Sequence, residues 1–284
     1  MHSILALLVA CVGCASAFAF SQTVPSSADP WASIASGSTT VADSSGKGGA
    51  TYRYRLVEPS KEAIADPGAR VPLVVFLHGS GERGADNRAQ LVHFAGGTAA
   101  PEFQRKAPCY VLAMQCPSGE TWSAIDLQGF RERGEMPRLA KDPTRAMRAL
   151  MQAIDEVRAS KAVDPTRVYL TGLSMGGFGA FDLAARRPGL FAAVVPICGG
   201  GDPSTAKAIA STPFYIVHGT DDPVVPVALS RAMREAIAGA SAELAAASRG
   251  AAQGTPDAPR PMPKRAPNPM YREYDKVGHD SWTP

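Results

Sequence analysis

The sequence predicts an α/β fold in which a mostly parallel, twisted sheet is covered by helices on both faces. Segments with helical periodicity alternate with short apolar, β-branched runs, and this alternation is typical of parallel strands that are buried on both sides. With 284 residues, 45% of them hydrophobic, the chain can build one large core. The buried strands are predicted at residues 71–77, 110–114, 168–171, 191–197 and 214–217.

The first fifty residues differ in composition from the rest of the chain. Residues 4–12 form an apolar run that is too short to cross a membrane and is followed by small residues, so residues 1–19 are predicted to be a secretory signal peptide. Cys11 leaves a lipoprotein acylation site as the minor alternative. Residues 20–50 are rich in Ser, Gly and Thr and are interpreted as a flexible leader, which leaves residues 51–284 for the folded domain.

Further segments complete the predicted framework. Residues 51–57 alternate in polarity, as expected for a half-exposed strand near a sheet edge, and residues 270–274 form a late strand. Helices are predicted over residues 143–159, behind an Asp-Pro start signal, and over residues 226–238, where the next residue is a glycine that should end the helix. Residues 239–268 are Ala-rich and then Pro-rich, which indicates a short helical piece followed by a surface insertion.

Charge and cysteine usage exclude several classes of protein. The formal net charge is +3 and the basic residues are dispersed, so no nucleic-acid-binding surface is predicted. Removal of the signal peptide would leave Cys109, Cys116 and Cys198, and this odd number is interpreted as three small buried thiols. No pair of cysteines has metal-ligand spacing, and neither a metal nor a cofactor is expected.

A serine at a strand-to-helix turn is the most informative feature of the sequence. The run GLSMGG at residues 172–177 follows an apolar strand and precedes a predicted helix at residues 178–187. This pattern is typical of a nucleophile elbow, in which glycines leave room for a strained turn that presents the serine hydroxyl at the N-terminus of a helix. Ser174 is therefore the predicted nucleophile.

A serine hydroxyl needs a base, usually a histidine, and a carboxylate that orients the base. Asp221 and Asp222 follow the strand at residues 214–217, at the edge where ligands collect in open α/β sheets. His279 is the only histidine after them and is the predicted base. Packing or backbone hydrogen bonding suffices for His78 and His218, which each precede a glycine at a strand end, and His93 is interpreted as a helix filler.

The loop after the strand at residues 71–77 is rich in glycine. Its sequence, HGSGERG, allows the backbone to approach a substrate, and the predicted oxyanion donors are the backbone N–H groups of Ser80 and Met175. Gly81 is the alternative to Ser80. The same run satisfies the G-x-G-x-x-G pattern of dinucleotide sites, but Glu82 would set a carboxylate against the pyrophosphate, so nucleotide binding is disfavoured.

Five motifs occur together and in chain order: HGSGERG at residues 78–84, QCP at 115–117, GLSMGG at 172–177, HGTDDPVVP at 218–226 and GHDSW at 278–282. The set resembles the bacterial carboxylesterases of the α/β-hydrolase superfamily. Relatives of that group include acyl-protein thioesterases, dienelactone hydrolases, feruloyl esterases, polyhydroxybutyrate depolymerases and the catalytic domain of prolyl oligopeptidases. The resemblance covers about residues 51–282 and implies the α/β-hydrolase fold.

The resemblance implies a role for each matching residue. Ser174 matches the nucleophile, His279 the base and Ser80 the oxyanion position. Asp222 matches the acid, because the family acid lies four residues after the histidine of the strand end, whereas Asp221 does not. The family normally has a C-terminal helix after the last strand, and the sequence given stops five residues after His279, so the expected fold lacks that helix.

These features predict a secreted or periplasmic serine hydrolase that cleaves carboxylic esters through an acyl-enzyme intermediate. The alternatives are a peptidase of the prolyl oligopeptidase type and an inactive hydrolase fold used for binding. The expected partner is a small-molecule or oligomeric ester, with no nucleic acid and no membrane span; the oligomeric state is left open. Residues 120–139 either cover the site, with Trp122 and Phe130 as candidate substrate contacts, or form a packed surface loop.

Overall fold

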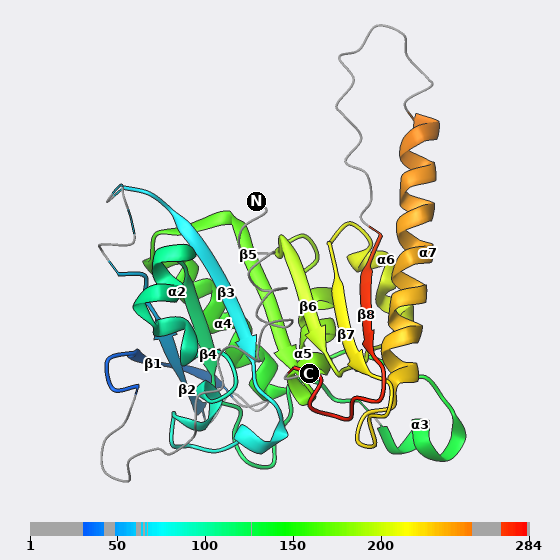
Figure 1. Ribbon diagram of the computed structural model, residues 1–284, viewed down its shortest axis with the longest axis horizontal. Helices are drawn as coiled ribbons and strands as arrows, with labels where there is room; N and C mark the ends of the chain where they lie inside the picture. The colour runs from blue at the N-terminus through cyan, green and yellow to red at the C-terminus, as the bar shows by residue number, and fades with distance from the viewer. Residues whose placement is uncertain are drawn as a thin grey trace, which may run out of the picture.

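The computed structural model describes residues 31–42, 49–60, 64, 66, 68–125, 127–251 and 268–282. Its centre is an eight-stranded sheet with the strand order β1-β2-β4-β3-β5-β6-β7-β8 (Figure 1). The pairs from β4 through β3 to β8 are parallel, and only the pairs β1–β2 and β2–β4 are antiparallel among the described strands. The predicted fold class, a mostly parallel sheet with helices on both faces, is confirmed.

The strands are β1 (Ala35–Ala42), β2 (Gly49–Val57), β3 (Val71–Leu77), β4 (Tyr110–Met114), β5 (Val163–Leu173), β6 (Ala193–Ile197), β7 (Tyr215–Gly219) and β8 (Met270–Tyr274). The helices are α2 (Pro101–Lys106), α3 (Leu127–Arg133), α4 (Arg145–Ser160), α5 (Met175–Arg186), α6 (Ala206–Ile209) and α7 (Val227–Ala251). None of the helices in the described part of the chain is both long and apolar enough to span a membrane.

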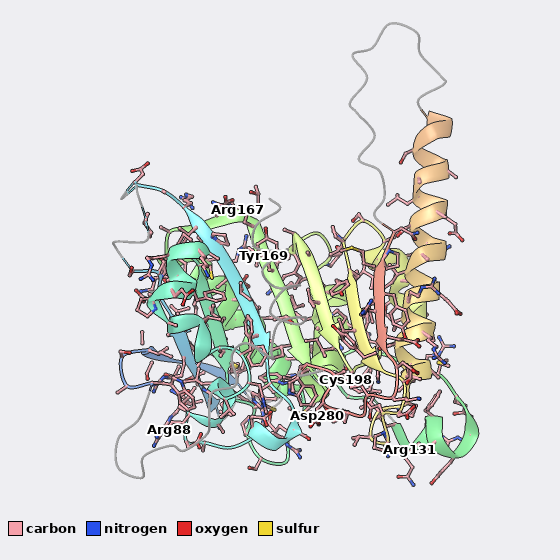
Figure 2. All side chains as sticks on the ribbon, viewed as in Figure 1. Arg88, Arg131, Arg167, Tyr169, Cys198 and Asp280 are labelled. Carbon is pink, nitrogen blue, oxygen red and sulfur yellow. The ribbon has the colours of Figure 1, made fainter. Side chains whose placement is uncertain are left out.

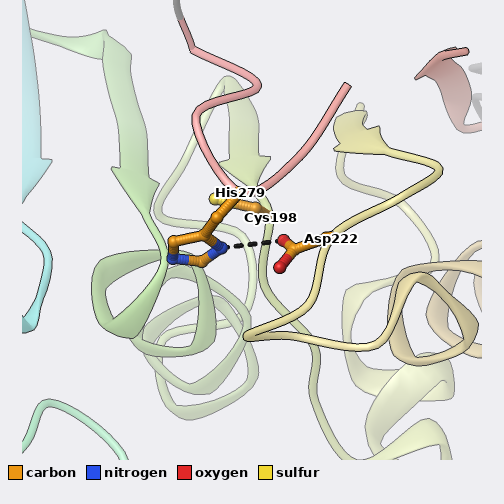
Figure 3. Close-up of side chains that lie close together, drawn as sticks. All are labelled: Cys198, Asp222 and His279. Carbon is orange, nitrogen blue, oxygen red and sulfur yellow. Dashed lines mark hydrogen bonds and ion pairs between the residues drawn. The ribbon is translucent and has the colours of Figure 1, made fainter. Parts of the chain in front are cut away.

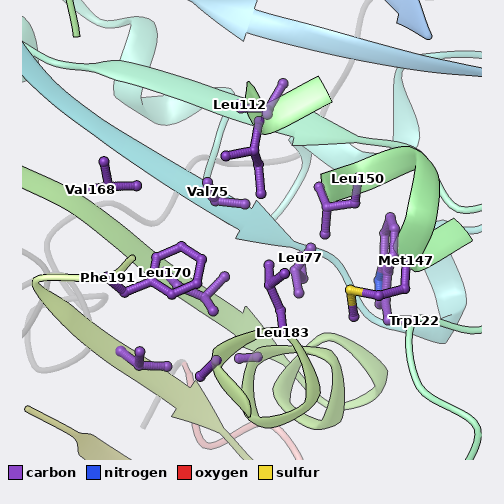
Figure 4. Packing of buried hydrophobic residues seen from close by; sticks show 14 of the residues in the cluster. Val75, Leu77, Leu112, Trp122, Met147, Leu150, Val168, Leu170, Leu183 and Phe191 are labelled. Carbon is purple, nitrogen blue, oxygen red and sulfur yellow. The ribbon is translucent and has the colours of Figure 1, made fainter. Parts of the chain in front are cut away.

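The central strands separate two hydrophobic cores. Every residue of β3 is buried, and because successive side chains point to opposite faces, Val75 and Leu77 enter one core while Val74 and Phe76 enter the other. The larger core is closed by α4, α5, α6 and α7, and Figure 4 shows Leu150 of α4 facing the β3 side chains. The smaller core is closed by α2 and the short helices near it. Burial on both faces explains why these strands appear in the sequence as continuous apolar runs.

The flexible leader assigned to residues 20–50 is a wrong prediction for Ala35–Ala42, which form the edge strand β1. Thr39 and Val41 are its buried side chains, in the alternation of a strand with one covered face. Thr39 Oγ1 also donates a hydrogen bond to Glu156 of α4 (3.1 Å). Small polar residues on the exposed face of an edge strand give it the composition of a linker, which is why the strand was missed. The predicted signal peptide, residues 1–19, lies outside the described residues.

The predicted end of the helix at Gly239 is also wrong, because α7 continues through this glycine to Ala251. A glycine inside a helix costs about 1 kcal/mol relative to alanine, and the Ala-rich segment that follows favours continuation of the helix. Among the described residues, no atom outside the adjoining backbone of α7 lies within 4 Å of the position that a Cβ of Gly239 would occupy, so no packing contact there requires a glycine. Residues 252–267 of the predicted insertion lie outside the described residues.

The cysteine prediction is confirmed. Cys109, Cys116 and Cys198 are buried thiols. Burial raises the pKa of the Cys116 thiol to about 12, as expected for a thiol that packs as a small apolar side chain.

An ion pair joins β8 to α7 and makes a testable contribution to stability. Arg231 donates Nε–H and Nη2–H to the Glu273 carboxylate at 2.6 and 2.7 Å. These hydrogen bonds lower the pKa of Glu273 from 4.5 to about 2. A depressed carboxyl pKa stabilises the folded state above its unfolded value, and this contribution is lost as the pH falls toward the folded value.

We therefore expect the free energy of unfolding to fall between about pH 4.5 and pH 2, and to fall less steeply in the Glu273→Gln variant. Urea denaturation over this pH range measures it. Glu243→Gln is the matched control, because Glu243 makes an exposed pair with Lys207. Parallel curves for the parent and Glu273→Gln would contradict the prediction.

Candidate active site

The turn between β5 and α5 holds Ser174 in an unusual backbone conformation. Ser174 has φ 53° and ψ −118°, a region that non-glycine residues occupy at a cost of about 1–3 kcal/mol. Two backbone hydrogen bonds hold the strained residue: Ser174 N–H donates to Ile197 O (2.9 Å), and Phe178 N–H donates to Ser174 O (3.1 Å). The turn sets Ser174 at the N-terminus of α5, where the helix dipole favours negative charge.

Three glycines around Ser174 are required by close backbone approaches. A Cβ on Gly176 would lie 2.0 Å from Leu77 O, and one on Gly172 would lie 2.4 Å from Gly176 O. A Cβ on Gly177 would meet the backbone of β6 at 2.5 Å. The first turn of α5 is therefore wedged between the ends of β3 and β6, which fixes the position of the serine.

We expect the Gly176→Ala variant to lose several kcal/mol of stability, or to fail to fold, because the obstructing atoms belong to the backbone and cannot rotate away. Gly239→Ala is the control: it lies in the interior of α7 with open space around it and should gain up to about 1 kcal/mol. Thermal and urea denaturation measure both variants. A Gly176→Ala protein with parent-like stability would contradict this account of the turn.

The structure brings three of the predicted site residues into direct contact. His279 Nε2 lies 2.8 Å from Ser174 Oγ. His279 Nδ1 lies 2.8 Å from Asp222 Oδ2, and this contact is drawn in Figure 3. The three residues follow β5, β7 and β8, whose parallel strands end at the same edge of the sheet. Asp221 is exposed, and its carboxylate instead accepts from Thr220 Oγ1, so Asp222 is the aspartate in contact with His279.

The hydrogen-bond partners indicate where the protons lie. An ionised carboxylate only accepts, so His279 Nδ1–H donates to Asp222 and leaves Nε2 free to accept the Ser174 hydroxyl proton. Asp222 Oδ1 accepts the N–H groups of Val224 and Val225, both at 2.8 Å. This arrangement can deprotonate the serine and stabilise the imidazolium that results.

The glycine-rich loop after β3 lies against the start of α5. A Cβ on Gly79 would lie 2.9 Å from Leu173 Cδ1, and Gly176 is packed against the backbone of His78. Ser80 opens a short 3₁₀ helix, η3 (Ser80–Glu82), and Arg83 Nε–H donates to the Ser80 carbonyl (2.9 Å). Met175 is the first residue of α5, and an N–H at that position has no acceptor within its own helix.

His78 holds the loop after β3 through hydrogen bonds of its ring. Cys116 N–H donates to His78 Nε2 (2.9 Å), so the ring proton lies on Nδ1, which donates to Gly79 O (2.6 Å). Burial lowers the pKa of His78, in keeping with a neutral ring. The backbone hydrogen-bonding role expected for this histidine is thus observed.

The two aromatic candidates for substrate contact differ in their surroundings. Trp122 is fully buried and donates Nε1–H to His78 O (3.1 Å), so its prediction as a substrate contact is wrong. The sequence left open whether Trp122 contacts substrate or packs within the loop, because burial of an aromatic residue depends on packing that local composition does not show. Phe130 of α3 is partly exposed and packs in a small apolar cluster with Phe178 and Val225. Phe178 lies one helical turn after Ser174, and Val225 follows Asp222 by three residues.

Two residues that sequence reasoning did not assign to the site connect its two main loops. The Trp282 ring packs edge-on against the rings of His279 (centroids 5.5 Å apart) and His93 (5.7 Å). His93 Nε2 in turn lies 3.2 Å from Glu82 Oε1 in the loop after β3. The contact between His93 and Trp282 joins residues far apart in the chain, so no spacing in the sequence indicates it.

One cluster of metal-ligating residue types occurs in the described part of the chain. Ligand atoms of Cys198, Asp222 and His279 all lie within 4.8 Å of one another (Figure 3). Burial raises the pKa of the Cys198 thiol, which opposes the thiolate form that binds metals. Figure 2 shows Cys198 and Asp280 together at the carboxyl edge of the sheet, with Tyr169 of β5 toward the opposite edge. We therefore interpret the cluster as the His279–Asp222 pair packed next to the buried Cys198 thiol, and not as a metal site.

Comparisons with known proteins bear on both the fold and the class of enzyme. Residues 126–248 match the model of the dienelactone hydrolase family. NocK of Nocardia uniformis subsp. tsuyamanensis, which is named as an esterase, is 31% identical over 180 residues, covering 63% of this chain and 47% of that protein. The crystal structure of a thermostable esterase has a TM-score of 0.67 and 34% identity, covering 88% of this chain and 59% of that one.

More distant structures share the fold alone. The structure of a puromycin-hydrolyzing peptidase of Mycobacterium tuberculosis has a TM-score of 0.55 at 15% identity. The match covers 88% of this chain and 37% of the peptidase chain. The chain spans less than half the length of NocK (47%). The activity of a whole relative therefore has to be tested on this chain directly.

Proposed function

We propose that this chain, which has the α/β-hydrolase fold, is a serine hydrolase that cleaves carboxylic esters through an acyl-enzyme intermediate. The observation that carries the proposal is the continuous hydrogen-bonded series from Ser174 Oγ through His279 to Asp222, with 2.8 Å at each step. The esterase names of the relatives support the choice of esters over amides.

In the first half of the proposed reaction, Ser174 Oγ attacks the ester carbonyl carbon while its proton passes to His279 Nε2. The carbonyl oxygen becomes an oxyanion, which the backbone N–H groups of Met175 and Ser80 stabilise. The intermediate then collapses, the bond to the alcohol oxygen breaks, and His279 returns the proton to the leaving alcohol. Asp222 stays ionised throughout and stabilises the imidazolium.

In the second half, water takes the place of the alcohol. His279 Nε2 accepts a proton from the water as its oxygen attacks the acyl carbon, and a second oxyanion forms at the same two N–H groups. Collapse of this intermediate breaks the bond to Ser174 Oγ, which recovers its proton from His279. The acid leaves and the enzyme is restored without a metal or cofactor.

The test combines a fluorophosphonate probe with a substrate panel of acetyl, butyryl and octanoyl aryl esters and a proline-containing peptide amide. We expect the probe to label Ser174, as mapped by mass spectrometry of the digested protein, and the esters to turn over faster than the amide. Faster turnover of the amide would favour the peptidase. Absence of both labelling and turnover would favour a binding module with an inactive hydrolase fold.

We also propose that the protein is exported and acts outside the cytoplasm as a secreted or periplasmic enzyme. The support is the apolar run at residues 4–12 with small residues after it. Expression of the full chain in a Gram-negative host, followed by intact-mass analysis of the periplasmic protein, should show cleavage near residue 19. A Cys11→Ser variant separates this from lipoprotein anchoring, and an unprocessed cytoplasmic product would contradict export.

A further inference from the structure

A second histidine contacts the carboxylate of the site from the interior of the protein. His218, in β7, is fully buried, and its Nε2 lies 3.1 Å from Asp222 Oδ2 and 2.9 Å from Val225 O. Its Nδ1 lies 2.7 Å from Ser230 Oγ in α7. Ser230 Oγ in turn lies 2.8 Å from Gly199 O. The reaction described above makes no use of His218 or Ser230.

The partners of His218 specify one of its protons. Nε2 faces a carboxylate and a carbonyl, which only accept, so Nε2 carries a proton. Ser230 has one hydroxyl proton for two acceptors, His218 Nδ1 and Gly199 O. If the proton points to Nδ1 the ring is neutral, and if it points to Gly199 the ring is cationic. In both cases Nε2–H donates to Asp222.

Asp222 is consequently held by four donors. Its Oδ1 accepts two backbone N–H groups, and its Oδ2 accepts His279 Nδ1–H and His218 Nε2–H. The Asp222 side chain is 0% exposed, whereas the His279 side chain is 18% exposed and stands on a loop. In the His279–Asp222 pair, the Asp222 carboxylate is therefore the more tightly held partner. His218 is the buried side chain that contacts its Oδ2.

We propose that His218 is a positioning residue: its Nε2–H holds Asp222 Oδ2 in the orientation that aligns His279, and Ser230 holds the His218 ring in place through its contact with Nδ1. This inference rests on the proposed function. Burial lowers the pKa of His218, and Nε2–H donates to Asp222 in the neutral and in the cationic ring alike. The ionisable groups that face His218 are Asp222, His279 and Glu273, its partner in the β7–β8 register.

Loss of the Nε2–H donor frees Asp222 to rotate and so disorders His279. We expect His218→Leu to lower kcat about tenfold with KM within about twofold, because the alignment is needed in the transition state rather than for substrate binding. A purely structural role would lower stability and leave kcat and KM unchanged per active site.

Two further variants separate positioning from packing. His218→Gln places an amide N–H near the position of Nε2 and should recover most of kcat. Ser230→Ala leaves the imidazole but removes the contact to Nδ1, and should lower kcat about threefold. Ser241→Ala is the matched control, because Ser241 is a buried serine of the same helix whose Oγ donates to Ala210 O (2.9 Å), away from the site. It should leave kcat unchanged.

The experiment counts active sites with the fluorophosphonate, measures kcat, KM and the pH–rate profile, and records ¹⁵N and low-field ¹H NMR spectra of histidine-labelled protein. We expect His218 to carry its proton on Nε2 and the His279 Nδ1–H signal to shift in His218→Leu. Unchanged kcat and an unchanged His279 signal in His218→Leu would overturn the proposal, as would a His218 ring without a proton on Nε2. If His218→Leu does not fold, an unchanged His279 signal in Ser230→Ala overturns it.

These readouts also distinguish two kinds of failure. A parent protein that neither hydrolyses esters nor reacts with the fluorophosphonate would refute the proposed function. The NMR signals of His218 and His279 do not depend on turnover, so they would still decide whether His218 holds Asp222 in position.

Discussion

The Ser174→Ala variant is expected to lose ester hydrolysis, with kcat reduced by at least about 10⁴-fold. Without Oγ no covalent acyl-enzyme can form, and the remaining oxyanion donors can only assist direct attack by water. Loss of the fluorophosphonate label should accompany loss of turnover. If the variant keeps its native thermal transition, these two losses assign Ser174 as the nucleophile. A misfolded protein would lose the thermal transition as well.

The folded state of Ser174→Ala should be close to that of the parent. The backbone hydrogen bonds that hold position 174 involve its N–H and carbonyl, which alanine retains. Ser80→Ala is the matched control, because the proposed contribution of Ser80 is its backbone N–H and its exposed side chain can be removed without loss; kcat should change less than about twofold. Turnover above one hundredth of the parent value in Ser174→Ala would mean that another group performs the attack.

Buried strands and their order along the chain were the parts of the fold that the sequence predicted best. The apolar runs at residues 71–77 and 110–114 coincide with β3 and β4, because strands buried on both faces need apolar side chains at every position. β1 was missed because only Thr39 and Val41 face the protein interior. The end of α7 was misplaced because a glycine is a weak stop signal when the residues after it favour helix.

The site residues that follow strand ends could be predicted from the sequence. The side-chain contacts that depend on how helices pack on the sheet could not. Ser174, Asp222 and His279 follow three strands of one parallel sheet, so the strand order alone brings their backbones to the same edge. The contacts of Trp122 with His78 and of His218 with Ser230 depend on how α4, α5 and α7 pack on the sheet. No periodicity or spacing encodes such contacts, because each joins residues from elements that meet only in the folded chain.

Asp222→Asn is expected to lower kcat/KM by about 10³–10⁴-fold while leaving the fold intact. The amide oxygen of the new side chain must take the place of Oδ1, since that atom accepts the N–H groups of Val224 and Val225. The amide NH₂ then replaces Oδ2 and donates to His279 Nδ1, while His218 Nε2–H keeps Val225 O as its acceptor. His279 is forced into the tautomer with its proton on Nε2, the atom that faces Ser174 Oγ, and it cannot accept the serine proton.

The same hydrogen-bond requirement makes the cause of the loss measurable. ¹⁵N NMR of Asp222→Asn should show the His279 proton moved from Nδ1 to Nε2, whereas Asp221→Asn should leave tautomer and rate unchanged, because Asp221 is exposed and contacts Thr220 instead. The opposite amide rotamer would restore the His279 tautomer only by turning NH₂ toward the N–H groups of Val224 and Val225, and the loss of an acceptor for the Val225 N–H, a buried residue, costs about 1–3 kcal/mol. An Asp222→Asn variant with parent-like kcat/KM, or one that loses activity with the His279 proton still on Nδ1, would show that the carboxylate does not act by fixing the imidazole.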